Sequence, residues 1–248
     1  MIRLATGVTP NYLPRARAFI TSLNQHCNVE PNVFAVNFYP EHPNFGAIPA
    51  IPVDYNQAWI RLPKFMLQHG GFCQFAPRSW DDNDIVIFTD ADAILQRPFT
   101  KTELAEFEEL PPRFILAGYN MPNEKQTLMD EATRISPTTG LDAILAAFPA
   151  ANRMACRNWG FVVASMWTWR ELCADVLKLD TICANHFMNP ARVQWMCCYA
   201  AQRGHLELRD LSPVIHAHGH CGLKDGLTKG EDGLWRQDGK VVAFAHAL

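Results

Sequence analysis

Apolar positions along the chain alternate between strand-like runs and helical spacing through the first half of the sequence. These patterns predict strands over residues 2–8, 33–38, 85–88, 114–118, 161–165 and 214–216. They predict helices over residues 13–24, 58–69, 167–179 and 192–203. A hairpin is expected over residues 234–244, because Asp238-Gly239 favours a tight two-residue turn.

The run Ile85-Val86-Ile87-Phe88 contains no polar residue. Such a run is typical of a strand buried on both faces of a mostly parallel sheet. Strands that alternate with helices predict an α/β fold with one central sheet. No repeat or Gly/Ser-rich linker divides the 248 residues, so we expect a single domain over 1–248.

Composition narrows the choice of partner and compartment. The formal net charge of −3 at pH 7 argues against a broad electrostatic grip on nucleic acid. No apolar segment approaches the roughly 20 residues that span a bilayer. The first residues lack the pattern of a secretion signal, so we expect a cytoplasmic protein without a membrane span.

Asp90-Ala91-Asp92 follows the buried run directly. Open α/β sheets bind ligands beyond the carboxyl ends of their strands, and carboxylates at i and i+2 can face the same side. Such a pair offers hard oxygen ligands to Mg²⁺ or Mn²⁺. A pair of surface cap residues is the alternative. The second acidic triplet, Asp82-Asn83-Asp84, is interpreted as a solvated turn before the strand.

Residues 85–98, I-V-I-F-T-D-A-D-A-I-L-Q-R-P, resemble the D-x-D strand of GT-A glycosyltransferases, in particular those of family 8. The resemblance implies a GT-A domain, a mostly parallel twisted sheet flanked by helices. It implies transfer of a sugar from a nucleotide-sugar to an acceptor hydroxyl. Asp90 is then expected to face the ribose and the metal, Asp92 to chelate the metal with the diphosphate, and Ala91 to lie beside the nucleotide.

The segment Thr6-Gly7-Val8-Thr9-Pro10-Asn11-Tyr12 is similar to the family's nucleoside-binding loop. The resemblance implies that donor-binding contacts come from Thr6, Val8, Thr9, Asn11 and Tyr12, with the ring of Tyr12 stacked on uracil. A UDP-sugar is the expected donor, although the loop lacks the acidic residue that often reads the base.

The resemblance implies that three basic residues contact the diphosphate of the donor. Arg61 and Lys64 lie in a segment that resembles the basic helix before the D-x-D strand, and Lys224 follows a histidine-rich strand. A cation beside a diphosphate is a sensible partner. Solvated helix charges are the alternative for the first two.

Asn158-Trp159-Gly160 resembles the family's N-x-G segment, in which the asparagine faces the sugar. Gln194 matches the second residue of an Asp-Gln pair found in retaining members, and Val193 stands in place of the aspartate. Asn158 and Gln194 are therefore the expected catalytic-site contacts to the sugar. Inversion needs a carboxylate base at the acceptor, and none lies near Gln194 in the sequence, so we favour retention.

The family's metal-binding histidine lies on a late strand, and here His216, His218 and His220 alternate along one. Residues two apart share a face of a strand. We expect His216 to bind the metal because it follows an apolar pair, with His218 as the second candidate. An imidazole beside two carboxylates favours Mn²⁺ over Ca²⁺. Acceptor binding, a solvated strand end and a zinc site with Cys221 are the alternatives.

Two other functions remain open. A metal-dependent nucleotidyltransferase would want a Gly-rich phosphate loop near the N-terminus, where only Gly7 is present. A non-catalytic module that binds nucleotide-sugars or glycans would not need a cation site. The expected acceptor is a saccharide, and a modified DNA base or a protein is also compatible with the sequence.

Overall fold

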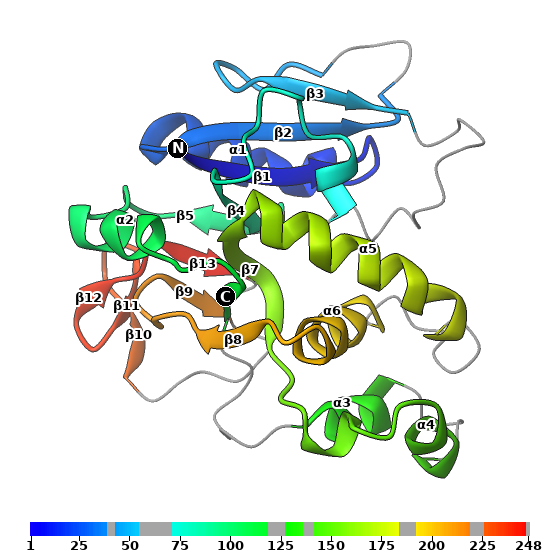
Figure 1. Ribbon diagram of the computed structural model, residues 1–248. Helices are drawn as coiled ribbons and strands as arrows, with labels where there is room; N and C mark the ends of the chain where they lie inside the picture. Colours follow the sequence, from blue (N-terminus) through cyan, green and yellow to red (C-terminus); the bar gives the residue numbers. More distant parts are fainter. Residues whose placement is uncertain are drawn as a thin grey trace.

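The computed structural model describes residues 1–38, 43–54, 71–118, 127–135, 141–183, 192–218 and 226–246. The helix expected over residues 58–69 lies outside these ranges. In chain order (Figure 1) the elements are β1 (Ile2–Val8), α1 (Leu13–His26), β2 (Glu30–Val36), β3 (Ala50–Val53), η2 (Gly71–Gln74), β4 (Ile85–Thr89), β5 (Ala93–Leu95), α2 (Lys101–Glu108), β6 (Phe114–Gly118), α3 (Leu128–Ile135), α4 (Leu141–Ala147), η3 (Ala151–Arg153), β7 (Asn158–Ser165), α5 (Met166–Cys183), α6 (Arg192–Arg203), β8 (Glu207–Asp210), β9 (His216–His218), β10 (Leu227–Lys229), β11 (Trp235–Gln237), β12 (Lys240–Val241) and β13 (Phe244–His246).

Seven strands form the central sheet in the order β3-β2-β1-β4-β7-β6-β8. Strand β7 runs antiparallel to both of its neighbours, β4 and β6. Every other pair in the sheet is parallel. The chain therefore has the predicted α/β fold with a mostly parallel sheet.

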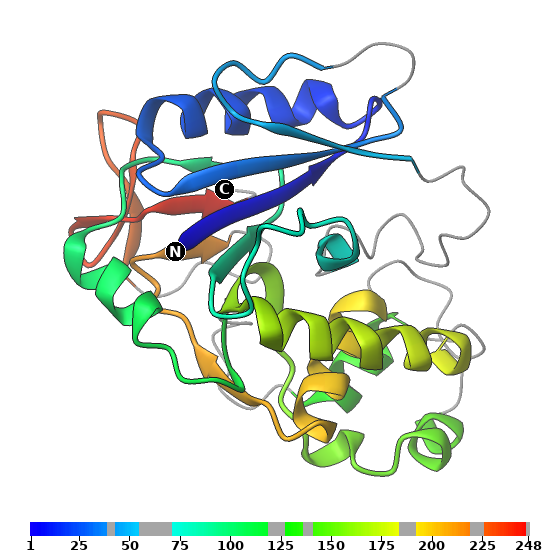
Figure 2. The same ribbon diagram turned by 45° about the horizontal axis from the view of Figure 1, so that its top comes forward.

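Two hydrophobic cores cover the two faces of this sheet. Val86 and Phe88 of β4 pack into the core formed with α5 and α6, and Ile85 and Ile87 pack into the core formed with α1 and α2. The indole N–H of Trp169 on α5 donates to the carbonyl of Val86 at 3.0 Å and fixes the helix to the strand. The prediction that residues 85–88 form a strand buried on both faces is confirmed. Figure 2 shows α1 with β1–β3 on one side and α3–α6 on the other.

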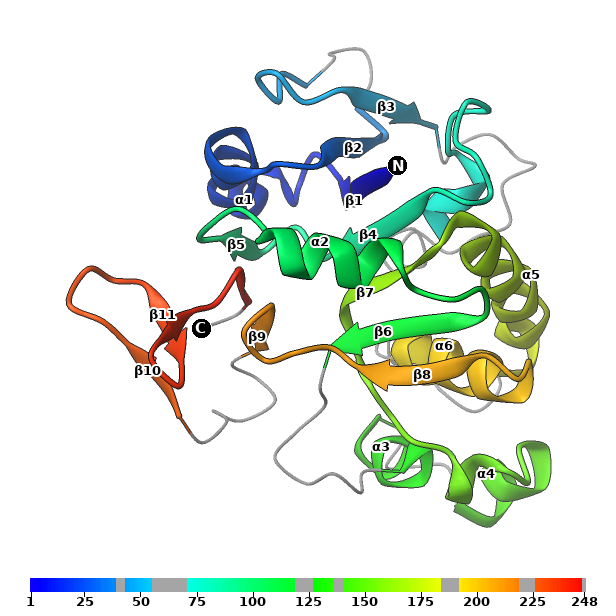
Figure 3. The same ribbon diagram turned by 60° about the vertical axis from the view of Figure 1, so that its left-hand side comes forward.

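Two small sheets complete the described chain. Strand β13 lies between β5 and β9, antiparallel to the first and parallel to the second. Strands β10, β11 and β12 form an antiparallel sheet at the edge of the molecule (Figure 3). The β11–β12 turn has Asp238 at φ 51° and Gly239 at φ 78°, as a tight hairpin of this type requires. The expected hairpin is therefore confirmed.

The acidic triplet 82–84 is only partly the solvated turn that the sequence suggested. Asp82 and Asn83 are exposed in a turn, but the side chain of Asp84 is buried. The Nε of Arg3 donates to its carboxylate at 2.8 Å. The interpretation was wrong for Asp84, because a buried cation from β1 compensates its charge.

Within the described ranges, every helix is too short or too polar to cross a bilayer.

Candidate metal centre at the end of strand β4

Asp90 and Asp92 lie in the turn between β4 and β5, at the carboxyl end of the buried strand. The backbone N–H of Asp90 donates to the carbonyl of Gly160 on β7 at 2.9 Å. Ala91, between the two acids, is 3% exposed and belongs to the core on the α1 side. The Asp90 side chain is 25% exposed and that of Asp92 is 40% exposed. The turn is thus anchored through its backbone and Ala91, while both carboxylates remain accessible.

The third member of the site is His246, which the sequence interpretation did not single out. Strand β13 pairs with β5 so that His246 lies opposite Ala93, the residue after Asp92. His246 Nε2 is 2.9 Å from Asp92 Oδ1 and 3.8 Å from Asp90 Oδ2. Among the described residues, Asp90, Asp92 and His246 each offer one potential metal-ligand atom, and these three atoms all lie within 4.8 Å of one another.

His216, the histidine expected in this position, lies behind the site. Strand β9 pairs with β13 so that His216 is opposite Phe244, two register pairs before His246. Its ring is buried against Phe161, with centroids 5.3 Å apart, and its centroid is 5.6 Å from that of His246. His246 therefore lies beside the acidic pair, in the position that we expected for His216. The pairing of β13 with β5 and of β9 with β13 determines which histidine reaches the turn. His218 aligns with His246 in backbone register.

Two glycines make room for the two histidines. A Cβ at Gly160 would lie 2.7 Å from His246 Cε1 and 3.0 Å from Asn158 Oδ1. A Cβ at Gly118 would lie 2.9 Å from His216 Nδ1. Cβ atoms essentially never lie closer than 3.0 Å to another heavy atom, so the histidine would have to move in either case. Each buried imidazole therefore rests on a backbone position that has no side chain.

The charges of the site stabilise one another. Burial lowers the pKa of His246, but the hydrogen bond to Asp92 and the negative charges of Asp90 and Asp92 outweigh burial and raise the pKa above its ordinary value. Burial raises the pKa of Asp92, but the bonds from His246 and Tyr12 hold that pKa well below its ordinary range. The contact between His246 Nε2 and Asp92 Oδ1 thus lies where the potential ligand atoms of the three residues converge.

The predicted nucleoside loop reaches the same edge of the sheet. The hydroxyl of Tyr12 donates to Asp92 Oδ2 at 2.7 Å. The hydroxyl of Thr9 donates to the side-chain oxygen of Asn11 at 2.7 Å within the loop. Thr6 and Val8, on β1, are fully buried. The structure therefore brings Tyr12 into contact with the acidic pair. Asn11 is exposed and bonded to Thr9, whereas Thr6 and Val8 are buried in the interior.

Asn158 and Gln194, the expected sugar contacts, meet around the start of β7. Asn158 is 6% exposed and its Oδ1 accepts the N–H of Gly160 at 2.8 Å. Gln194 on α6 is half-buried, and its Oε1 accepts the N–H of Trp159 at 3.3 Å. Asn158 therefore lies beside the glycine that seats His246, and Gln194 contacts the intervening residue of the same segment.

Arg61, Lys64 and Lys224, the expected diphosphate contacts, lie outside the described residues, as does His220.

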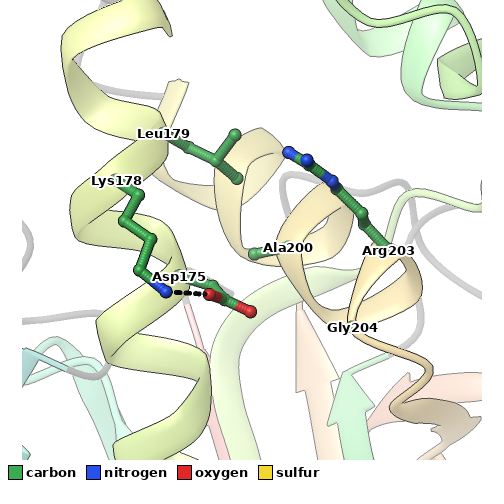
Figure 4. Close-up of a pocket in the computed structure, with 6 residues that line it drawn as sticks. All are labelled: Asp175, Lys178, Leu179, Ala200, Arg203 and Gly204. Carbon is green, nitrogen blue, oxygen red and sulfur yellow. Dashed lines mark hydrogen bonds and ion pairs between the residues drawn. The ribbon is translucent and has the colours of Figure 1, made fainter.

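A cavity of about 350 Å³ lies elsewhere, between α5 and α6 (Figure 4). Its walls include the ion pair of Asp175 and Lys178, with an N–O distance of 3.0 Å. It adjoins Gly204, just before the amino end of β8, and β8 runs in the same direction as β4. The cavity is therefore at the edge of the sheet opposite the acidic pair and shares no residue with it.

No protein-family model matches the sequence, and no curated protein matches it. Solved structures do match. The galactosyltransferase LgtC, solved in complex with donor and acceptor sugar analogs, is 11% identical, with a TM-score of 0.58 over 99% of this chain and 86% of LgtC. Mouse xyloside xylosyltransferase 1, in its apo form, is 14% identical, with a TM-score of 0.57 over 99% of this chain and 97% of that protein. At these identities the likeness establishes the fold: this chain has the GT-A fold of glycosyltransferases.

Proposed function

We propose that this chain is a metal-dependent glycosyltransferase that takes a sugar from a nucleotide-sugar, with a UDP-sugar as the expected donor, and transfers it to an acceptor hydroxyl. One observation carries the proposal: two carboxylates and an imidazole converge where β4 ends in a GT-A fold. Open α/β sheets bind their ligands at this edge. The names of the two structural relatives describe glycosyl transfer, which agrees with the proposal.

The ligand set suits Mn²⁺ or Mg²⁺. Two carboxylate oxygens are hard ligands for either ion, and the imidazole nitrogen of His246 favours Mn²⁺. When bound, the cation supplies positive charge that stabilises a departing diphosphate. His246 must give up its Nε2 proton to serve as a ligand, so cation binding should release a proton.

The residues around this centre supply the remaining contacts to the donor. Tyr12 offers its ring to the nucleobase, and Asn11 and Thr9 border that place in the loop. The Asn158 amide can both donate to and accept from sugar hydroxyls. We assign Gln194 to the side of the sugar that Asn158 contacts, because its Oε1 accepts the N–H of Trp159, the residue after Asn158.

We assign the diphosphate contacts to Arg61, Lys64 and Lys224, in line with the resemblance on which they were selected. Cationic side chains form strong charge-assisted hydrogen bonds with phosphate oxygens.

Retention of configuration is the favoured outcome. Inversion needs a carboxylate base directed at the acceptor hydroxyl. At the carboxyl end of β8, Asp210 is engaged by Arg157, with Nε 2.6 Å from Oδ1. We propose a saccharide hydroxyl as the acceptor, with a protein or a modified DNA base as the other acceptors to test.

The test is donor turnover. The purified chain should be incubated with a panel of UDP- and GDP-sugars in Mn²⁺, in Mg²⁺ and in EDTA, and release of nucleoside diphosphate should be measured. We expect slow hydrolysis of one donor that depends on the cation and is lost in EDTA. Candidate acceptors can then be ranked by how strongly they accelerate release, and the anomeric configuration of the product reports retention or inversion.

Asp92→Asn is the matched variant, because it removes the charge and keeps the shape. We expect it to abolish metal-dependent donor binding while the free energy of unfolding changes by less than about 1 kcal/mol. Asp82→Asn changes an exposed carboxylate that pairs with Arg170, away from the site, and should leave donor binding intact. The proposal fails if no nucleotide-sugar is bound or consumed with any divalent cation, or if Asp92→Asn binds donor as the wild type does.

A further inference from the structure

The Tyr12–Asp92 hydrogen bond joins two parts of the chain that lie 80 residues apart. Tyr12 is the N-cap residue of α1, and its backbone N–H donates to the carbonyl of Thr9 at 3.0 Å. Its carbonyl accepts the N–H of Ala16 at 3.1 Å, and its ring packs against the core on that face of the sheet. The phenol is therefore held by the start of a helix, independently of the turn that carries Asp92.

Asp92 is the more exposed of the two acids, so packing alone does little to fix its carboxylate. Two hydrogen bonds fix it instead, one on each oxygen: His246 Nε2 is 2.9 Å from Oδ1, and the Tyr12 hydroxyl is 2.7 Å from Oδ2. The partners come from β13 and from the loop after β1, so they define the plane of the carboxylate from two directions.

These two bonds would respond differently to a cation. Oδ1 and Nε2 are 2.9 Å apart at the place proposed for the ion, so an ion that binds both atoms would replace the hydrogen bond between them. The bond on Oδ2 involves neither Nε2 nor Asp90 and can persist. The Tyr12 phenol is an O–H donor at neutral pH, and it donates to Oδ2 at 2.7 Å.

We propose that Tyr12 is a positioning residue for the metal centre: its hydroxyl orients Asp92 so that Oδ1 faces the cation. This inference rests on the proposed function, because it assumes that Asp92 binds a metal. It assigns the hydroxyl a role separate from that of the ring, which is free to stack on a nucleobase. Hydrogen-bond partners of this kind around metal ligands are worth about 10- to 100-fold in metal affinity.

The test is the affinity for Mn²⁺ alone, measured by the loss of the free-ion electron paramagnetic resonance signal on titration with the full chain. Tyr12→Phe removes the hydroxyl and keeps the ring. Tyr199→Phe is the matched control, because Tyr199 is stacked on Trp195 in α6, away from the acidic pair. Thermal unfolding is followed for each variant, and nucleotide binding is measured in EDTA to report on the ring alone.

We expect Tyr12→Phe to weaken Mn²⁺ binding by about tenfold or more, with an unchanged melting temperature and unchanged nucleotide binding in EDTA. Tyr199→Phe should bind Mn²⁺ as the wild type does. Wild-type affinity in Tyr12→Phe overturns this inference and leaves the proposed function standing. A lower melting temperature that accounts for the lost affinity also overturns it, since the hydroxyl would then be structural. A wild-type chain that binds no Mn²⁺ overturns this inference, whereas the proposed function fails only if no divalent cation supports donor binding or turnover.

Discussion

Replacing Gly160 by alanine tests the position of the His246 ring without substituting any proposed metal ligand. The added Cβ would lie 2.7 Å from His246 Cε1 and 2.9 Å from its Nδ1. Carbon atoms in contact need about 3.4 Å or more, so the ring has to retreat by about 0.7 Å. Cε1 is bonded to Nε2 in a rigid ring, and Nε2 must shift by a similar amount. Its 2.9 Å contact with Asp92 then approaches the limit of a hydrogen bond.

Displacements near 1 Å in a preorganised site cost up to about 100-fold. We therefore expect Gly160→Ala to weaken Mn²⁺ binding by about 10- to 100-fold. The crowding should also destabilise the fold by about 1–3 kcal/mol. Titration of the Mn²⁺ resonance signal and thermal unfolding measure the two effects separately.

Gly118→Ala is the control, because it introduces a similar clash with a different histidine. Its Cβ would lie 2.9 Å from His216 Nδ1 and 3.3 Å from the backbone oxygen of Asn158. The variant should lose a similar amount of stability and bind Mn²⁺ about as well as the wild type. Equal Mn²⁺ affinity in both variants would refute the assignment of His246 as the ligand. A loss confined to Gly118→Ala would move the ligand to His216.

Two further predictions concern the histidines and the buried ion pair. His246→Ala should weaken Mn²⁺ binding by at least about tenfold, and His216→Ala by much less; the reverse order in the same titration would restore His216 as the ligand. Asp84→Asn should lower the free energy of unfolding near neutral pH by about 2 kcal/mol, because it removes a charged partner of buried Arg3. Burial raises the pKa of Asp84, but hydrogen bonds from Arg3, the backbone N–H of Asp81 and the N-terminal amine, with the charge of Arg3, together hold the pKa below its ordinary value. The gap between wild type and Asp84→Asn should therefore be constant above about pH 5 and narrow as the pH falls through the unfolded and then the folded pKa of the carboxyl. Denaturant unfolding at several pH values measures it, and a gap that widens in acid contradicts the reasoning.

The sequence predicted the strands of the central sheet best where a buried strand has an uninterrupted run of apolar residues. The polar-free run 85–88 is β4, and residues 114–118 are β6. Strand β5 and strand β13, each three residues long, carry too few positions for a periodic pattern to show. Strand β7 begins three residues before the expected start, because Asn158 enters the sheet and its side chain bonds to Gly160.

The acidic pair of the site was predictable because a buried strand leads directly into it. The histidine was not, because which imidazole reaches the turn depends on long-range pairing. His216 lies in a conspicuous cluster, yet among the described strands its own strand, β9, pairs with β13 alone, and β13 lies between β9 and β5. His246 follows the apolar residues Val242, Ala243 and Phe244, and that polar end of a buried run was the available signal.

The pairing of β13 with β5 also bears on the order in which the protein matures. It closes a loop of about 150 residues, whereas β1, β2 and β4 meet over much shorter separations. Long closures are the slower steps of folding. On the ribosome the acidic turn emerges well before the segment that bears its histidine. Competence to capture a cation would then arise late, and a shortened product ending before residue 244 would retain both carboxylates and lack the imidazole.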